Sequence, residues 1–197
     1  MRLFRKTGLT KRKQGDSNAL GDGFTLIEAV VAVSVFAVAV TAIVGSLLAV
    51  LRINEKSRAI RVVEQNARFL SEFIAREVRN GSLNYAAYGG GLSQPESVLH
   101  LINSNNEAES IYLSGSTLYL NKSGVGAAPL TSADVVVSNL NFYIYPLSDP
   151  FQVGGPNAQP RVTFTFKLTS SLSIRPTDQA SINVQSTVVP RDYPQSN

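Results

Sequence analysis

The spacing of hydrophobic positions changes at residues 24, 52 and 98, and each change predicts a different element. Residues 24–51 are mostly apolar, and the 23 residues 29–51 carry no charge. At about 1.5 Å per residue, this charge-free run spans roughly 34 Å and exceeds the hydrocarbon core of a bilayer, which is about 30 Å thick. A cleavable secretory signal has a shorter apolar region of about 7–15 residues. Residues 24–51 are therefore predicted to form a membrane-spanning helix.

Residues 52–80 carry charges but keep a helical period. Their hydrophobic side chains recur at steps of mostly three or four, which predicts an amphipathic continuation of the same helix. No proline interrupts residues 24–94, and Asn80-Gly81 is a typical stop signal, so one helix of about 55 residues is expected. The stripe expected to face a core consists of Ile53, Ile60, Val63, Ala67, Leu70, Ile74 and Val78. A second face carries charges at i,i+4, which support a helix modestly: Glu64, Arg68, Glu72 and Arg76.

Short segments of alternating polarity follow, and all nine prolines lie at or after Pro95. The Gly/Ser-rich residues 81–97 are expected to be a linker, and residues 98–197 an antiparallel β-sheet domain. A hairpin is predicted to turn near Ser114-Gly115, between two of these segments. The expected strands are VLHLI, SIYLS, TLYLN, VVVSNLNFYIY, RVTFTFKL and SINVQSTVV.

The segment RVTFTFKL predicts a sheet with one dry and one wet face, because alternate residues of a strand point to opposite sides. Its dry face would need a cover, which the stripe on residues 52–80 can provide. The predicted fold class is therefore α+β, with a long N-terminal helix whose C-terminal half packs against an antiparallel β-sheet. The expected dry positions are Val162, Phe164, Phe166 and Leu168, and the expected wet ones are Thr163, Thr165 and Lys167.

The net charge of +4 comes entirely from the first 23 residues. Residues 1–23 hold six basic and two acidic residues, whereas the rest of the chain holds 12 of each. This distribution removes the main support for nucleic-acid binding, which needs a basic domain surface. The absence of cysteine excludes disulfides, thiolate metal sites and cysteine nucleophiles.

Glu28 is the unusual charge, because it is the fifth residue of an otherwise apolar segment. A carboxylate in a membrane-spanning helix costs about 2–3 kcal/mol near the centre and less near an end. Taken alone, Glu28 is best explained as a helix-end acid at the membrane surface. Its surroundings in the sequence change that interpretation.

A basic leader ends at Gly23, and Phe24, a short uncharged stretch, Glu28 and a long apolar helix follow in register. The segment GFTLIEAVVAV closely resembles the class III signal of type IV pilins and of the pseudopilins of type II secretion systems. The resemblance covers residues 1–51 strongly. The long helix followed by an antiparallel sheet extends it more loosely to the whole chain.

The resemblance implies a role for three residues. A prepilin peptidase, which is also an N-methyltransferase, would cleave after Gly23 and methylate Phe24 as the new N-terminus. Glu28 would guide the subunit into a filament. Cleavage creates an α-amino group with a pKa of about 8, so a neighbouring subunit's amine could pair with Glu28 and offset its cost. Residues 1–23 would be a cleaved leader, and other partners would be the bilayer, further pilin or pseudopilin subunits, assembly ATPases and a membrane platform.

Two features depart from major pilins. The paired cysteines that close a C-terminal loop in many shaft subunits are absent, and Gly45 stands where many pilins have a helix-weakening proline. The segment NARFLSEFIAREVRNGS with a bulky sheet domain is more similar to minor pilins or to the J-type pseudopilin. The expected location is a single-pass cytoplasmic membrane protein with an exported C-terminal domain, which later enters an extracellular pilus or a periplasmic pseudopilus.

No catalytic or cofactor site is expected. His100, the single histidine, is interpreted as a strand residue, with Glu96, Glu107 and Glu109 the nearest acids for a metal site. A calcium site near Asp149 lacks further acidic ligands in its loop.

Two rival functions remain open. A signal-anchored exported protein that binds a ligand and never polymerises would leave Glu28 dispensable. An anchored hydrolase would depend on His100 or a pair of acids. The positive-inside rule does not choose a topology, because five basic residues lie within 20 residues of each end of the span.

Overall fold

The computed structural model describes residues 23–89, 91–172 and 175–191. The predicted leader therefore lies outside the described residues, apart from Gly23. Two compact units make up the chain, Met1–Ser46 and Leu47–Asn197, and the long helix contributes residues to each.

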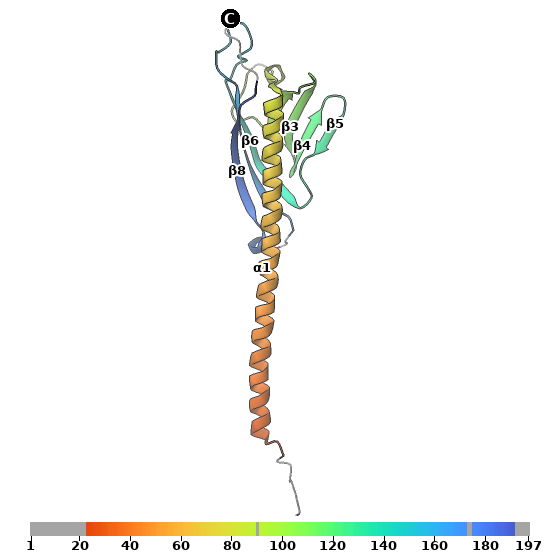
Figure 1. Cartoon of the computed structure of the whole chain (residues 1–197), viewed down its shortest axis with the longest axis vertical. Coiled ribbons are helices and arrows are strands. Elements are labelled where there is room, and N and C mark those ends of the chain that lie inside the picture. The colour runs from red at the N-terminus through yellow and green to blue at the C-terminus, as the bar shows by residue number, and fades with distance from the viewer. Residues whose placement is uncertain (1–22, 90, 173–174, 192–197) are drawn as a thin grey trace, which may run out of the picture. The chain divides into compact units, whose positions relative to one another are not determined.

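Helix α1 runs from Leu26 to Asn80 without interruption, which confirms the single long helix expected from the sequence (Figure 1). It ends at the predicted stop signal, where the Gly81 N–H donates to the carbonyl of Glu77 at 2.9 Å. Glycine is required there because a Cβ on Gly81 would lie 2.6 Å from the carbonyl oxygen of Ile102. The chain can therefore turn directly from the helix into the sheet domain.

Two antiparallel sheets follow the helix, where the sequence suggested a single sheet. In the first, β1 to β5 lie in sequential order, and in the second β7 lies between β6 and β8. The hairpin turns at Gly115-Ser116, since Ser114 pairs with Thr117. The first sheet contains β1 (Ser82–Leu83), β2 (Val98–Ile102), β3 (Ala108–Ser114), β4 (Thr117–Lys122) and β5 (Gly126–Pro129). The second contains β6 (Val135–Tyr145), β7 (Arg161–Ser170) and β8 (Ser181–Val188).

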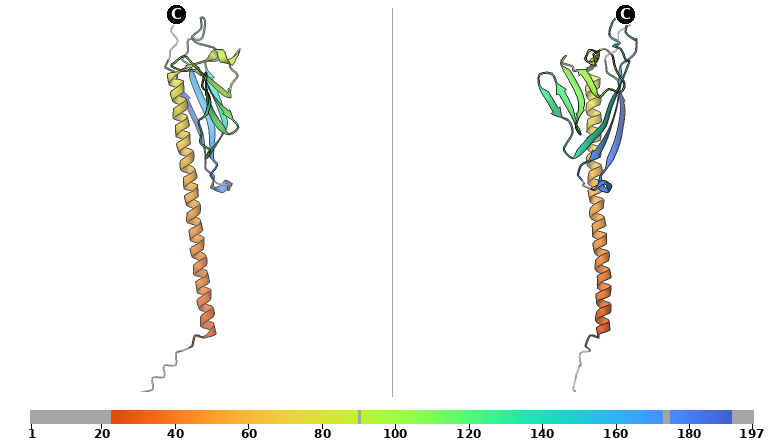
Figure 2. Two further views of the ribbon diagram at one scale, coloured as in Figure 1. Left: turned by 90° about the vertical axis from the view of Figure 1, so that its right-hand side faces the viewer. Right: turned by 180° about the vertical axis from the view of Figure 1, so that it is seen from behind.

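The core of the Leu47–Asn197 unit lies between α1 and the two sheets (Figure 2). The predicted dry face of β7 is confirmed, because its four alternate hydrophobic residues are at most 2 % exposed. The helix stripe is confirmed over its C-terminal part and wrong at its start. Ile53 and Ile60 are 64 % and 40 % exposed, whereas Ala59, which the prediction missed, is fully buried. The buried helix residues are Ala59, Val63, Ala67, Leu70, Ile74 and Val78.

The misplaced start of the stripe reflects where the sheet domain begins to cover the helix. Ala59 is the first buried residue of α1, and just before it the Lys56 Nζ donates to the carbonyl of Thr177 at 3.0 Å. Ile53 lies before both residues and is mostly exposed. Hydrophobic periodicity cannot show where a cover ends, so the sequence alone placed the stripe about two turns too early.

Strand β6 buries odd-numbered residues in its first part and even-numbered residues in its second part. Val135 and Val137 are buried, and then Leu140, Phe142 and Ile144 are buried instead. The pairing with β7 shifts between Ser138 and Asn141, and Asn139 adopts a positive φ of 55°. This β-bulge adds one residue and so keeps hydrophobic side chains on the core side along the whole strand.

The segment 81–97, which the sequence suggested as a linker, contains β1 and the 3₁₀ helix η1 (Tyr85–Tyr88). It also pairs with the outer edge of β6. Glu96 and Phe142 exchange two backbone hydrogen bonds of 2.8 and 2.9 Å. The side-chain amide of Gln94 bonds both backbone groups of Ile144, at 2.7 and 3.1 Å, as a neighbouring strand would. This segment therefore joins the two sheets.

The core assignment predicts a large difference between Leu70→Ala and Ile53→Ala. Leu70 is fully buried, so its truncation should lower the free energy of unfolding by about 2–5 kcal/mol. Ile53 is exposed, so its truncation should change it by less than about 0.5 kcal/mol. Urea unfolding of a soluble segment starting at residue 52 measures both. Equal losses would contradict the placement of the core.

Candidate functional site

The motif residues lie where α1 begins, and Thr25 caps the helix there. The Thr25 hydroxyl accepts a hydrogen bond from the backbone N–H of Glu28 at 3.3 Å, and its carbonyl accepts one from Ala29 at 3.1 Å. Because the helix starts at Leu26, Glu28 is its third residue. Thr25-x-x-Glu28 thus has the spacing of a capping box. The sequence analysis missed this role of Thr25, although the spacing signals it.

The position of Glu28 in the first turn contributes to its stability as a carboxylate. The backbone N–H groups at a helix N-terminus carry partial positive charge, which stabilises a nearby anion by about 0.3–1 kcal/mol. This falls short of the roughly 2–3 kcal/mol that a carboxylate costs deep in a membrane. The helix terminus therefore offsets part of the cost, and a position near the bilayer surface or a cationic partner would have to offset the rest.

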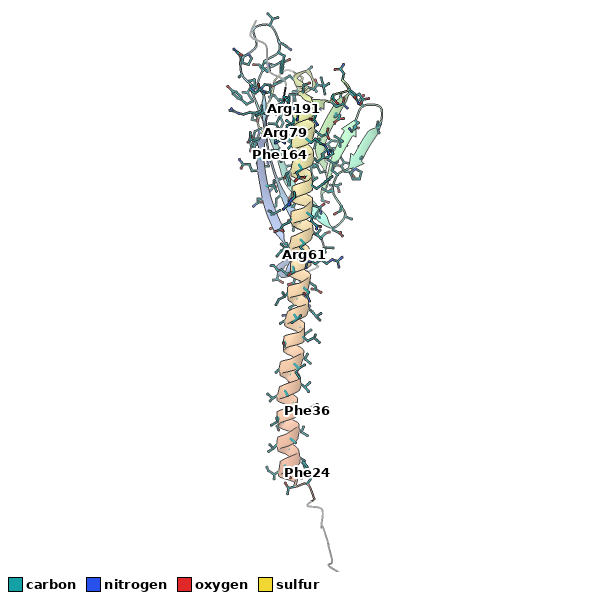
Figure 3. All side chains as sticks on the ribbon, in the orientation of Figure 1. Phe24, Phe36, Arg61, Arg79, Phe164 and Arg191 are labelled. Carbon is teal, nitrogen blue, oxygen red and sulfur yellow. The ribbon has the colours of Figure 1, made fainter. Side chains whose placement is uncertain are left out.

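Every residue in the range 23–56 is exposed in the single chain. Figure 3 shows the side chains around this part of α1, including Phe24 and Phe36, pointing outward from the helix. Among the described residues, α1 is the one helix whose length and composition would let it cross a membrane. Its apolar surface is expected to contact lipid or another protein, because leaving so large an apolar area in water is energetically unfavourable.

Two hydroxyl side chains inside the apolar half, those of Ser34 and Thr41, are bonded within the helix. The hydroxyls of Ser34 and Thr41 donate to the carbonyls four residues earlier, at 2.7 and 2.8 Å. A hydroxyl bonded to its own helix in this way can enter hydrocarbon without an unpaired donor. Gly45 does not interrupt the helix, and a Cβ placed on it would meet nothing within 4 Å.

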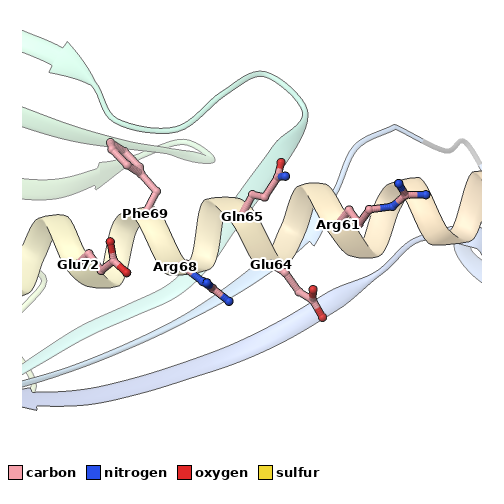
Figure 4. A pocket seen from close by; sticks show the side chains of 6 residues that line it. All are labelled: Arg61, Glu64, Gln65, Arg68, Phe69 and Glu72. Atoms are coloured by element: carbon pink, nitrogen blue, oxygen red, sulfur yellow. The ribbon is translucent and has the colours of Figure 1, made fainter.

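The amphipathic half of α1 leaves a charged face exposed on the side away from its buried stripe. Figure 4 shows the six residues that line an open pocket there, which are Arg61, Glu64, Gln65, Arg68, Phe69 and Glu72. Within the described part of the chain, no ion pair joins Glu64, Arg68 and Glu72, although their i,i+4 spacing suggested such pairs. These charges are solvated, since an exposed pair gains only about 0.2–0.5 kcal/mol.

His100 is a strand residue packed against Tyr88. Its backbone N–H donates to the Tyr88 hydroxyl at 2.9 Å, and the two rings meet edge-on with centroids 5.0 Å apart. Burial lowers the pKa of His100 below its ordinary value of 6.5, although nearby Glu96 opposes this. Burial likewise raises the pKa of Tyr88 to about 12.

Of the acids considered as metal ligands, Glu109 points away from His100. Glu109 pairs in register with Leu101, so it lies on the opposite face of the sheet from His100. It is buried and bonded to Lys122 at 2.8 Å and to Asn103 at 2.7 Å, and the hydrogen bond from Lys122 to Glu109 raises the pKa of Lys122. Across the described residues, no group of three His, Asp or Glu side chains could hold a metal ion.

Asp149 stabilises its own loop, because its carboxylate accepts a hydrogen bond from the backbone N–H of Phe151 at 2.9 Å. This short-range bond fixes the start of the turn that follows. Asp149 therefore has a structural role in the loop 148–160.

The lowered pKa of His100 predicts a pH-dependent stability. The folded protein prefers neutral His100, so its stability is complete above pH 6.5 and falls as the pH drops through the folded-state pKa. As the single imidazole, His100 gives one NMR titration curve, with an expected midpoint below 6.5. The variant His100→Gln should lose this component of the pH dependence of unfolding. A midpoint at or above 6.5 would contradict the environment described for the ring.

Comparison with known proteins finds the motif and little else. The family model described as the prokaryotic N-terminal methylation motif matches residues 22–44. No curated protein and no solved structure matches the chain. The matched residues include Gly23, Phe24, the Thr25 cap and Glu28, and they continue into the apolar half of α1. This motif leads directly into a long apolar helix and a domain of antiparallel sheets, and the combination supports a type IV pilin-like family.

Proposed function

We propose that the protein is a structural subunit that is cut after Gly23, methylated on Phe24 and assembled through its N-terminal helix into a filament. The observation that carries this proposal is the register of three features. The methylation motif covers residues 22–44, α1 begins three residues after Gly23, and Glu28 occupies the first helical turn. Cleavage would thus place the new amine next to the start of the helix.

Assembly supplies what the single chain lacks. Among the described residues, the apolar half of α1 stays exposed, and bundling with other such helices would cover it as the subunit leaves the bilayer. In that bundle, the Phe24 amine of one subunit would pair with Glu28 of another. The charged face of α1 between Arg61 and Glu72 remains available to further subunits.

The subunit is proposed to be a minor or initiating one, in a type IV pilus or a type II secretion pseudopilus. Its domain of two sheets without cysteine supports this over a major shaft subunit. Its partners would be the prepilin peptidase, other pilin or pseudopilin subunits and the membrane platform. Its work would be structural, in adhesion, motility, secretion or DNA uptake. It is not proposed to be an enzyme.

The Thr25 cap favours one rival function. A helix-end carboxylate that is stabilised by the helix terminus at the membrane surface needs no partner subunit. The chain would then be a signal-anchored exported binding protein that does not polymerise. The two functions differ in whether the leader is removed and in whether Glu28 matters.

Mass spectrometry of the intact protein tests processing. Protein expressed in its native host and extracted from membrane and filament fractions should lack residues 1–23 and carry one methyl group on Phe24. Gly23→Val should keep the leader, because a bulky side chain would block a small-residue cleavage site. An intact Met1 terminus in a host with active prepilin peptidase would favour the signal-anchored rival.

Replacing Glu28 tests assembly separately. Glu28→Ala and the isosteric Glu28→Gln should be cleaved normally but lower incorporation into sheared filaments by about tenfold or more, because losing about 1.4 kcal/mol of charge pairing is a factor of ten. Thr25→Ala is the matched control, since it removes the capping hydroxyl and leaves the carboxylate. Wild-type amounts of Glu28→Ala in filaments would show that the pairing does not operate.

A further inference from the structure

Exposed cations and leucines gather at the point where the charge-free run of α1 ends. Leu51 is the last residue of that run, and Arg52 follows it. An open surface pocket lies here, within the Leu47–Asn197 unit. Its apolar lining comes from Leu48, Leu51 and Leu172, and its charged lining from Arg52, Glu55, Arg58 and Arg175. We call these seven residues the basic collar.

The loop between β7 and β8 brings two of these residues to the helix. Leu172 and Arg175 belong to that loop, more than 110 residues after Arg58 in the sequence. The hydrogen bond from Lys56 to the carbonyl of Thr177 holds the loop against this turn of α1. The collar is therefore a product of the fold, and the sequence analysis, which counted charges only along the chain, did not find it.

The charge of the collar is unbalanced and unpaired. The pocket lining contains three arginines and one glutamate. Within the described ranges, Arg52, Arg58 and Arg175 form no ion pair and no side-chain hydrogen bond. The three leucines beside them are between 36 % and 50 % exposed. Unpaired guanidinium groups next to exposed leucines fit a partner with anionic groups above an apolar layer.

We propose that the basic collar binds the anionic phospholipid headgroups of the leaflet from which α1 emerges. The charge-free run fills the hydrocarbon core, so Arg52 falls at its boundary. Arg58 lies six residues further, about 9 Å along the helix, which is close to the depth of a headgroup layer. A guanidinium binds phosphate oxygens through two parallel hydrogen bonds, and leucines favour the boundary with the acyl chains.

This docking rests on membrane anchoring and does not depend on filament assembly. It accounts for basic residues on both sides of the span, which left the positive-inside rule undecided. Those after Leu51 serve a surface of the folded domain, where anionic lipid attracts clustered Lys and Arg. A subunit that waits in the bilayer would then hold this end of its sheet domain at the membrane surface.

A single fluorescent label tests the docking, because the chain has no cysteine of its own. The full-length Thr177→Cys variant, labelled with an environment-sensitive dye, is placed at one copy per nanodisc. Discs contain either phosphatidylcholine alone or phosphatidylcholine with phosphatidylglycerol. The emission should shift to shorter wavelength only in the anionic discs. Raising the salt from 0.1 to 1 M should reverse the shift, because the Debye length falls from about 10 to about 3 Å.

Charge variants show whether the collar causes the shift. The triple variant Arg52→Gln, Arg58→Gln, Arg175→Gln should lose it, and Glu55→Gln should enlarge it. The matched control Arg68→Gln, Arg76→Gln, Arg79→Gln removes the same charge from the far end of α1 and should keep it. A label at Val153→Cys reports the opposite end of the domain. Its loop follows Pro146, whose carbonyl accepts a hydrogen bond from Tyr85, just after the C-terminal end of α1. That label should not shift.

Three outcomes would overturn the proposal. These are equal emission in both kinds of disc, a triple variant that behaves like the wild type with unchanged circular dichroism, or a shift that needs two copies per disc whatever the lipid. The last would assign the collar to a second copy of the chain. Because the measurement uses single subunits in a bilayer, its failure leaves the proposal of filament assembly untouched.

Discussion

The structure depends on one constraint, which is that a single helix must satisfy two different surroundings along its length. Up to Leu51, α1 is apolar apart from Glu28 and a few hydroxyl side chains, and the described residues leave it exposed. From Ala59 onward, the same helix fills the space between two sheets. Each sheet has a dry face that would be unstable in water without this cover. The sheet domain therefore cannot be separated energetically from the second half of the helix.

Sequence reasoning succeeded where periodicity decides the answer. The alternation along β7 and the spacing of Val63, Leu70 and Ile74 each follow from one repeating pattern, and the structure confirms them. It failed where the answer depends on distant parts of the chain. Ile53 has the right spacing for the core but lies before the part of α1 that the sheets cover, and the division into two sheets follows from which distant strands pair.

The candidate site shows the same division. A local signal marks Glu28 and its neighbours, and the family motif confirms that the signal is present. The cap by Thr25 is also local and could have been predicted from its spacing to Glu28. The basic collar is different, because Arg175 reaches Arg52 only after the fold has formed. Counting charges along the sequence could not have shown that Arg52 and Arg175 lie in one pocket.

The bonds that segment 81–97 makes to β6 have a consequence for crowded surroundings. An open strand edge invites the edge of another molecule, which leads to strand exchange or aggregation. On the outer edge of β6, the N–H groups of Val137, Phe142 and Ile144 are already occupied by bonds from within the chain. In that sheet, β8 is left as the edge at which a neighbouring chain could add a strand. Many copies of the chain could therefore lie close together. The outer edge of β6 would not pair with a strand of a neighbouring copy, because its N–H groups are already bonded.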